Sequence, residues 1–494
     1  MLQRDISTAR EVDPRTCVLE VVQLIVKHPF AELDRVAGFA FFRTWPKRSS
    51  LGGVFMMKQS LLAAFAVVTG LASLTACSSP SSTTAPNPPS TSPAPTSGKV
   101  TINWAASPIA NVGIRKQLIQ LFEKANPSIK VNLISQPSST DTNRASLITE
   151  ISGGSTTPDV FMGDVVWPGQ FAAQSLAEPL NKHFPASFFT RFAPGLVQGA
   201  TIKGNVYAAP FFMDAGFLYY RKDLLQKAHL PVPKTWEQLQ SEAKTLVSNK
   251  MVKYGFVWEG ASYEGLTCNW MEYLTDAGGQ VFNAQGKPNM DTPAAQHALS
   301  FMRGLITSGV SPQAVSVFQE PQAMNTFNNG QAAFLRNWDY AWANSQTPGQ
   351  SSVVGKVGVV PLPTFAGHGA RGYACIGGWD LYINPHSKHM AADLTFINWM
   401  TSVPAQTVLA SQYSEIPTNA SVQNSPAVRA KNPVLSIVGQ TNLVARPAQN
   451  PYYAKVSTAI YTNVNAALAG QVSVSTALSQ ANAQLASAVG SSSL

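Results

Sequence analysis

Residues 99–134 read KVTINWAASPIANVGIRKQLIQLFEKANPSIKVNLI, and their pattern indicates the fold class. An apolar run at 100–106 is typical of a buried strand, and apolar residues then recur at helical spacing from 114 to 125. The Asn126-Pro127 pair ends that helix, and a second strand pattern follows at 130–134. We therefore expect strand–helix–strand units that build a largely parallel sheet in an α/β fold.

The same alternation continues along the rest of the chain. A third strand pattern occupies 158–162, and Thr235 with Gln238 predicts a capping box at the start of a helix. Further strand patterns, separated mostly by helical segments, lie at 204–210, 217–220, 254–258, 332–335, 357–361 and 379–383.

The chain before residue 99 has the features of an export leader. An apolar run at 61–76 follows Lys58 and ends in LTAC (74–77), which resembles a bacterial lipobox whose cysteine, Cys77, is diacylated. The run is shorter than a membrane span and fits a lipoprotein signal peptide at 56–76, with a buried helix ending in an ordinary cysteine as the alternative. Residues 1–55 precede this signal and are interpreted as an overlong gene start or a cytoplasmic extension.

A tether follows the proposed lipid anchor, and the charge is spread along the chain. Residues 78–98 contain 6 Pro and 11 Ser or Thr and no charge, so they predict an extended linker. The whole chain of 494 residues has a formal charge of +9, from 35 Lys and Arg against 26 Asp and Glu. Residues 1–77 hold 9 of these basic and 6 of these acidic residues, which leaves 26 against 20. The remaining basic residues do not cluster, which argues against a nucleic-acid partner.

Cysteine usage agrees with export. The body of the chain contains only Cys268 and Cys375, an even number for an oxidising compartment. We treat them as a candidate disulfide that would close a long loop, and two buried thiols are the alternative.

Two motifs that suggest cofactor chemistry are interpreted as ordinary loops. GHGARG (367–372) matches a dinucleotide-binding pattern, but prolines precede it and a strand pattern follows, where a helix is required. His386 and His389 lie beside a polar turn at Asn384-Pro385 and do not form a metal-binding pattern. We expect neither a metal nor a cofactor.

Aromatic residues and carboxylates recur where the strand patterns end. A sugar offers hydroxyl groups at its rim and apolar C–H faces, so a sugar site needs flat rings and charged hydrogen-bonding groups. Taken singly, each aromatic residue also fits an ordinary core. The candidates are Asp164, Trp167, Asp214, Trp338, Tyr340, Trp342 and Trp379.

Several segments, in order, resemble those of the sugar-binding family of ABC importer solute-binding proteins, and within it the trehalose and maltose branch. They are PDVFMGD (158–164), YAAPFFMD (207–214), LYYRKDL (218–224), PKTWEQL (233–239), FNNGQAA (327–333), RNWDYAW (336–342) and GGW (377–379).

The resemblance implies a two-lobed periplasmic-binding-protein fold of type II, like that of maltose-binding protein, with three crossings between lobes. We expect these crossings near 208–214, 354–362 and 384–390. The first lobe would comprise 99–210 and 358–386, and the second 211–357 and 387–494.

The resemblance also implies the roles of individual residues. Asp164 and Asp214 would accept sugar hydroxyls, Trp338 and Tyr340 would supply rings from the second lobe, and Gly377, Gly378 and Trp379 would approach the other sugar face. Arg446 would brace the ligand. The family often has an acidic residue after the first strand, where this chain has Ser107 to Asn111.

These observations predict a monomeric, membrane-anchored, extracytoplasmic binding subunit that captures a di- or oligosaccharide and delivers it to a permease with its ATPase. It would not be an enzyme. The alternatives are a secreted glycoside hydrolase that uses two of the carboxylates, and a lipoprotein that binds a solute other than sugar.

Overall fold

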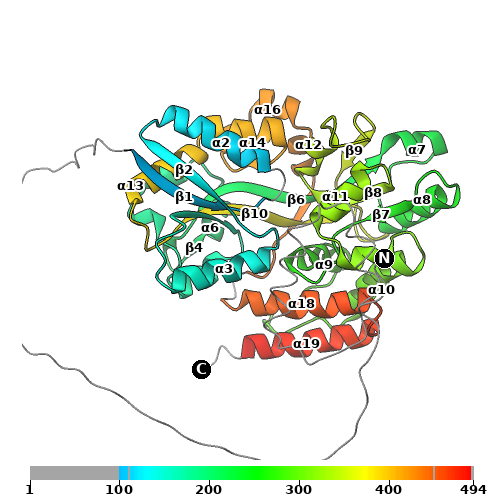
Figure 1. Ribbon diagram of the computed structural model, residues 1–494. Coiled ribbons are helices and arrows are strands. Elements are labelled where there is room, and N and C mark those ends of the chain that lie inside the picture. The colour runs from blue at the N-terminus through cyan, green and yellow to red at the C-terminus, as the bar shows by residue number, and fades with distance from the viewer. Residues whose placement is uncertain (1–98, 109–111, 449–450, 491–494) are drawn as a thin grey trace, which may run out of the picture. The chain divides into compact units, whose positions relative to one another are not determined.

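The computed structural model describes residues 99–108, 112–448 and 451–490 (Figure 1). The expected leader, signal peptide, Cys77 and tether lie outside these residues. Among the described residues, no helix combines the length and the apolar character needed to span a bilayer.

One mixed sheet runs through both lobes and sets the position of the site. Its main path over the described residues is β2-β1-β3-β10-β6-β8-β7. The strands β1 (Val100–Ala106), β2 (Ile129–Ser135) and β3 (Val160–Asp164) are parallel, as the sequence predicts. The strands β6 (Ala209–Arg221) and β10 (Tyr373–Ile383) run antiparallel to each other and to their other neighbours on this path. The sheet is therefore less parallel than expected.

The first lobe packs helices on both faces of β1, β2, β3 and parts of β6 and β10. α2 (Val112–Ala125), α13 (Met390–Met400) and α14 (Val403–Tyr413) cover one face, and α3 (Thr140–Ser152) lies on the other (Figure 1). Trp104, Phe122 and Phe396 pack edge to face in its core. The smaller elements are α4 (Pro168–Ala173), η2 (Leu180–Lys182), α5 (Ala186–Phe189), α6 (Pro194–Gly199), β4 (Thr201–Ile202) and β5 (Asn205–Val206).

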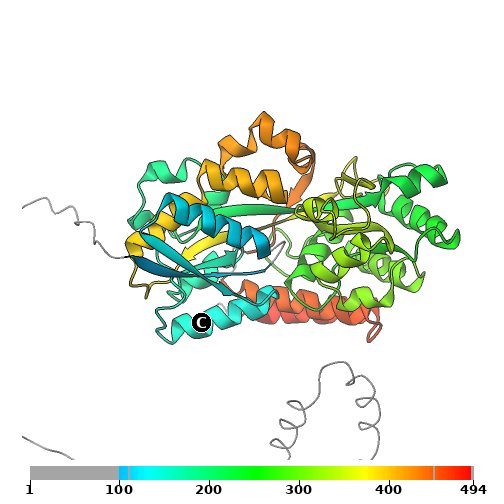
Figure 2. The ribbon, with the colours of Figure 1, turned by 45° about the horizontal axis from the view of Figure 1, so that its top comes forward.

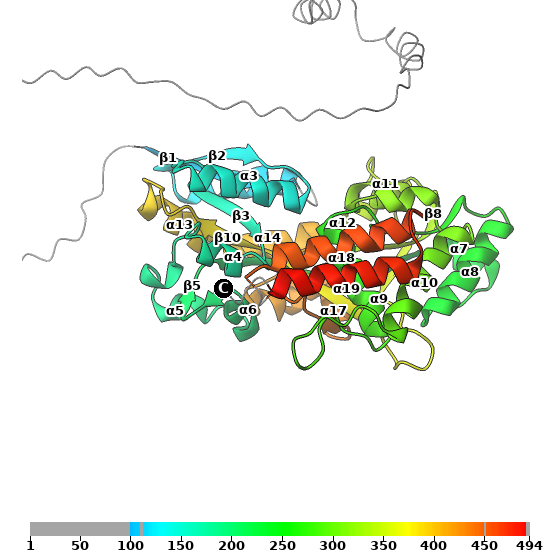
Figure 3. The ribbon, with the colours of Figure 1, turned by 90° about the horizontal axis from the view of Figure 1, so that it is seen from below.

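The second lobe is mainly helical around β7 (Tyr254–Val257), β8 (Ala332–Trp338) and β9 (Val357–Val360). The predicted capping box starts α8, where the Thr235 hydroxyl accepts from the Gln238 N–H. Figure 3 shows α18 (Tyr453–Leu468) beside α19 (Val474–Gly490). The other helices are α7 (Lys222–Ala228), α8 (Trp236–Ser248), α9 (Glu264–Asp276), α10 (Pro293–Thr307), η3 (Gln313–Val317), α11 (Glu320–Asn328) and α12 (Ala341–Ser345).

The segment after α14 contributes to the second core and contains short elements. They are β11 (Ile416–Pro417), α15 (Ala420–Gln423), α16 (Pro426–Lys431), α17 (Val434–Val438) and β12 (Asn442–Val444). β11 pairs with β6, and β12 pairs with β10. Figure 2 shows the two lobes side by side with β6 passing between them.

The two hydrophobic cores divide the chain differently from the expected spans. β6 passes from the first core to the second after Phe212, within the first expected crossing. β10 returns from the second core to the first between Cys375 and Trp379, and the chain crosses again after Leu409. Residues 358–375 therefore pack with the second lobe and 390–409 with the first. The expectation differs because Gly377-Gly378 hides the continuity of β10 in the sequence.

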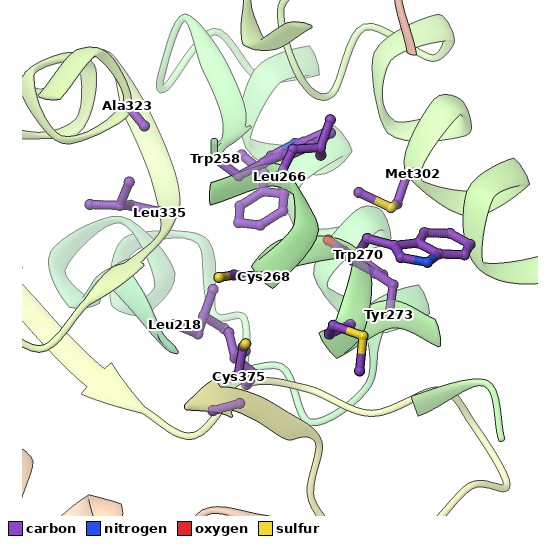
Figure 4. Close-up of a cluster of buried hydrophobic side chains, with 14 of the residues drawn as sticks. Leu218, Trp258, Leu266, Cys268, Trp270, Tyr273, Met302, Ala323, Leu335 and Cys375 are labelled. Atoms are coloured by element: carbon purple, nitrogen blue, oxygen red, sulfur yellow. The ribbon is translucent and has the colours of Figure 1, made fainter. Parts of the chain in front are cut away.

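The structure also describes the cysteine pair, the glycine-rich segment and the histidines that the sequence analysis considered. Cys268 and Cys375 are buried, free thiols that lie near each other in the second core (Figure 4). The structure therefore has two buried thiols and not the candidate disulfide. Residues 367–372 form a loop and not a helix start. His389 Nδ1 lies 2.9 Å from Asp159 Oδ1, so this histidine is paired with a carboxylate at the turn.

Candidate functional site

A pocket between the two lobes brings together all eight residues that the sequence predicts as ligand-binding. It also includes Thr140, Glu264, Gly265 and Cys268, which the sequence analysis did not assign to the site. Its lining consists of Thr140, Asp164, Asp214, Glu264, Gly265, Cys268, Trp338, Tyr340, Gly377, Gly378, Trp379 and Arg446.

Strand register explains why residues far apart in the sequence meet here. Trp379 is the cross-strand partner of Asp164 at the end of β3, and Gly377 is the partner of Asp214 in β6. Trp338, at the end of β8, is the partner of Gly216 two residues after Asp214. Because side chains of cross-strand neighbours lie close together, this register gathers carboxylates and rings at one place along β6 and β10.

Arg446 joins carboxylates from the two lobes. Its Nη1 and Nη2 donate to Asp164 Oδ2 at 3.1 Å and Oδ1 at 2.7 Å, which is a bidentate pair. Nη1 also donates to Glu264 Oε1 at 2.9 Å. The three side chains are almost fully buried. Arg446 therefore links the end of β3 in the first lobe to the start of α9 in the second.

Glu264 is held by further hydrogen bonds from α18. Tyr453 Oη donates to Glu264 Oε1, and Ser457 Oγ donates to Oε2 at 2.6 Å. Burial raises the pKa of Glu264, while the charge of Arg446 lowers it. The carboxylates around Arg446 keep the pKa of this guanidinium well above its usual value, despite the opposing effect of burial. The arrangement is a preorganised set of charged donors and acceptors.

The second lobe holds Trp338 on a rigid support. Tyr219 Oη donates to the Trp338 carbonyl at 2.7 Å, and the Arg336 guanidinium lies 4.2 Å from the Trp338 ring centre. Arg336 is itself fixed by buried ion pairs to Glu259 and to Glu272. The indole therefore keeps one orientation against the pocket.

The glycines of β10 allow the other wall to approach closely. A Cβ at Gly377 would lie 2.9 Å from Trp338 Cζ3, and one at Gly378 would lie 2.7 Å from the Phe212 carbonyl oxygen. Gly378 also has a φ of +137°, a conformation that favours glycine. The next residue, Trp379, packs edge to face against Trp167 at 6.1 Å between ring centres. Trp379 therefore has its ring supported from the first lobe.

Asp214 lines the pocket and has an unusual environment. Its side chain is buried, and its Oδ1 accepts no hydrogen bond from the described residues. Burial raises the pKa of Asp214 to about 7, with Asp164 adding to the increase. The position predicted as a sugar ligand is thus a carboxyl group that is poorly satisfied by the protein alone.

The size of the pocket shows that a ligand cannot enter without movement. Its free volume is about 30 Å³, room for one or two water molecules, whereas small-molecule sites usually have several hundred Å³. A larger cavity of about 670 Å³ shares Gly377 and Arg446 with it and extends along α4 and α6. The lobes or the Arg446 loop must move to join these spaces or to admit a ring.

The residues that the sequence analysis missed carry a weak sequence signal. Glu264 begins α9, where an acidic residue is common because it complements the helix dipole. Thr140 begins α3, and Cys268 lies one turn after Glu264. Glu264 and Cys268 have a spacing found in any helix, so only the packing of α9 against β10 identifies them.

Comparisons with known proteins agree on one family. A family model described as bacterial extracellular solute-binding protein matches residues 106–407. A probable ABC transporter-binding protein from Deinococcus radiodurans is 35% identical over 366 residues, which cover 72% of this chain and 86% of the relative. The mannitol-binding protein of Pseudomonas aeruginosa is 26% identical over 394 residues, with 74% of this chain and 88% of the relative covered.

Solved structures give the same result. The maltose-bound MalE3 of T. maritima has a TM-score of 0.74 and 36% identity, and the match covers 78% of this chain and 99% of that chain. A solute-binding protein from Agrobacterium radiobacter in complex with ribitol has a TM-score of 0.69 and 26% identity, with 78% and 98% covered. The two-lobed α/β fold expected from the sequence is thereby confirmed. The chain belongs to the bacterial extracellular solute-binding proteins, a family of substrate-binding proteins of ABC transporters and not of enzymes.

Proposed function

We propose that the interlobe pocket binds a di- or oligosaccharide of the maltose or trehalose type. The observation that carries this proposal is the convergence of three carboxylates, one arginine and two supported indole rings on a single pocket between the lobes. Carboxylates and arginine suit sugar hydroxyls, and flat rings suit the apolar faces of a pyranose. The neighbouring cavity of about 670 Å³ offers room for further rings.

The names of related proteins support the same ligand class. The T. maritima protein was solved with maltose, the A. radiobacter protein with ribitol, and the P. aeruginosa relative is named for mannitol. Sugars and sugar alcohols share the dense hydroxyl pattern that this pocket is suited to bind. The indole rings on both sides of the pocket favour a cyclic sugar over a linear polyol.

Binding would act through lobe closure. A sugar between Asp164 and Trp379 of the first lobe and Trp338 and Tyr340 of the second gains both sets of contacts only when the lobes are closed. It therefore shifts the population toward the closed form by its difference in affinity for the two forms. The closed form would then deliver the sugar to the permease subunits of an ABC importer, with the chain acting as a monomer.

A thermal-shift screen of the full-length chain tests the ligand class. Maltose, trehalose, maltotriose, mannitol and ribitol form the test panel, and single amino acids form the control panel. The proposal predicts the largest increase in Tm with a glucose disaccharide or trisaccharide, because a ligand that binds the native state stabilises it by mass action. An increase with amino acids alone would contradict it.

We further propose that Cys77 carries the lipid anchor and that residues 78–98 hold the body away from the membrane. The support is the LTAC sequence after an apolar run and the uncharged Pro-, Ser- and Thr-rich composition of the linker. Metabolic labelling with an alkyne analogue of palmitate should label the wild-type chain and not the Cys77→Ser variant. Equal labelling of both would refute the anchor at this residue.

A further inference from the structure

Three buried carboxyl groups meet beside the proposed sugar pocket, which shares Asp214 with them. Asp214 comes from β6, Asp339 follows β8, and Glu415 lies between α14 and β11. One oxygen from each of these side chains lies within 4.8 Å of the others. Asp339 and Glu415 have no exposed surface, and Asp214 has 4%. The cluster therefore lies where β6 and the segment after α14 pass between the lobes, and we call this region the hinge.

The protein alone does not satisfy these carboxyl groups. Both carboxylate oxygens of Glu415 and Oδ1 of Asp214 accept no hydrogen bond from any described residue. Asp339 accepts from the backbone N–H of Ala215 at 3.3 Å and of Ile416 at 3.0 Å. The side-chain neighbours of Asp214 include the carboxyl groups of Asp339 and Glu415. Contact between carboxylates becomes attractive only if a cation or a proton lies between them.

Among the described residues, Arg115, on α2, is the only one whose positive charge acts on both Asp214 and Glu415. Arg446, in the pocket, acts on Asp214 as well. The Arg115 guanidinium is buried against the rings of Phe211 and Phe212 at 5.9 and 5.4 Å, and no described residue accepts a hydrogen bond from it. With all three carboxyl groups ionised, the one guanidinium would leave two negative charges uncompensated. Burying such charges costs several kcal/mol each. One divalent cation would neutralise them.

We propose that Asp214, Asp339 and Glu415 bind one calcium ion at the hinge. The donor set contains only oxygen, which suits hard cations such as Ca²⁺ and Mg²⁺. Three carboxylates supply up to six oxygens, one from each side chain within 4.8 Å of the others, and the oxygens of Asp214 and Glu415 that accept no hydrogen bond are shielded from solvent. Mg²⁺ usually keeps several of its water molecules, so a closed site favours Ca²⁺.

Such an ion would couple the hinge to the sugar pocket. Asp214 belongs to both sites, and a bound cation would keep it ionised and fix its orientation as an acceptor for sugar hydroxyls. It would also tie Glu415, from the third crossing, to β6 and to the end of β8. This effect on sugar affinity rests on the proposed function, whereas calcium binding itself does not.

Calcium binding is tested on the full-length chain after removal of metal with EDTA and exchange into chelator-free buffer. Calorimetric titration with CaCl₂ should give one site per chain, and Ca²⁺ should raise the Tm relative to EDTA. MgCl₂ should bind at least about tenfold more weakly. Elemental analysis of protein purified without chelator should find calcium near one equivalent.

Two variants test whether calcium binding depends on the hinge cluster or on any buried carboxylate. Glu415→Gln removes one charge without breaking a hydrogen bond from a described residue, and it should weaken calcium binding at least about tenfold. Glu242→Gln is the matched control, because Glu242 is also buried with an unsatisfied oxygen but lies on α8. It should bind calcium like the wild type. If Glu415→Gln fails to fold, the titration and the elemental analysis of the wild type still show whether the chain binds calcium.

The proposal is overturned if millimolar CaCl₂ gives no binding heat and no change in Tm, because the cluster then holds protons instead of a metal ion. Equal loss of calcium binding in Glu415→Gln and Glu242→Gln would also overturn it. Calcium binding without any sugar binding would leave the ion site standing and would refute only the proposed function.

Discussion

The Arg446 bridge makes the strongest prediction about stability. Replacing Arg446 with Met removes three charge-assisted hydrogen bonds, to Asp164 Oδ1, Asp164 Oδ2 and Glu264 Oε1. It also leaves two buried carboxylates facing each other without their counter-ion. Removing one partner of a buried ion pair costs about 3–5 kcal/mol, so we expect the free energy of unfolding to fall by this amount.

A double-mutant cycle with Asp164→Asn makes the test sharper. In the wild type this change weakens the bridge and should destabilise the protein. In the Arg446→Met background it removes an uncompensated buried charge and should be stabilising. The change of sign corresponds to a coupling energy of about 2–3 kcal/mol, at the upper end of measured pair couplings.

Urea unfolding of the full-length chain, followed by tryptophan fluorescence without sugar, measures the cycle. The matched control is the Arg221–Asp223 pair, which has short contacts but leaves Asp223 37% exposed. A cycle of Arg221→Met and Asp223→Asn should give a coupling below about 1 kcal/mol. If Asp164→Asn costs the same with and without Arg446, the bridge does not hold the lobes as described.

Three further predictions concern the pocket, a buried acid and the thiols. Trp379→Phe keeps a flat ring with less contact area and should weaken sugar binding up to about tenfold in calorimetry, with an unchanged circular dichroism spectrum; equal affinity would place Trp379 outside the sugar contacts. Burial raises the pKa of Asp380 to about 8, so the folded state binds the proton of this carboxyl group more tightly than the unfolded state does. The protonated carboxyl group therefore stabilises the folded state at low pH, and this stabilisation is lost as pH rises from about 4 to about 8. Asp380→Asn should therefore flatten the pH dependence of the unfolding free energy by at most about 1.4 kcal/mol per pH unit, and an unchanged slope would refute the raised pKa. In a Cys17→Ser/Cys77→Ser background, thiol titration in denaturant without reductant should find both Cys268 and Cys375, and finding neither would show a disulfide.

Local sequence patterns predict much of the first lobe. The strand at 100–106 and the helix that ends before Asn126 agree with β1 and α2, because their apolar spacing reflects burial in a nearby core. The direction of the hinge strands is not encoded locally. β10 crosses between the cores through Gly377-Gly378, and its two halves pack in different lobes. Lobe boundaries therefore depend on tertiary contacts.

Some residues of the site could be predicted from the sequence, and others depend on tertiary contacts. Asp164, Trp338 and Trp379 could be predicted because they lie in segments that resemble those of a known family. Glu264 could not, because its role depends on Arg446, which lies 182 residues away in the chain. The carboxyl cluster around Asp214 is also hidden, since its members come from three separate segments and meet only at the hinge.

A crystal structure of the full-length chain with the sugar that gives the largest thermal shift would locate the ligand. We expect the sugar between the lobes, with hydroxyl groups bonded to Asp164 and Arg446 and with a ring packed against Trp379 or Trp338. To admit it, the pocket must be larger than the present volume of about 30 Å³. Sugar density at another place on the protein, with the Arg446–Asp164 pair unchanged, would show that the interlobe pocket is not the sugar site.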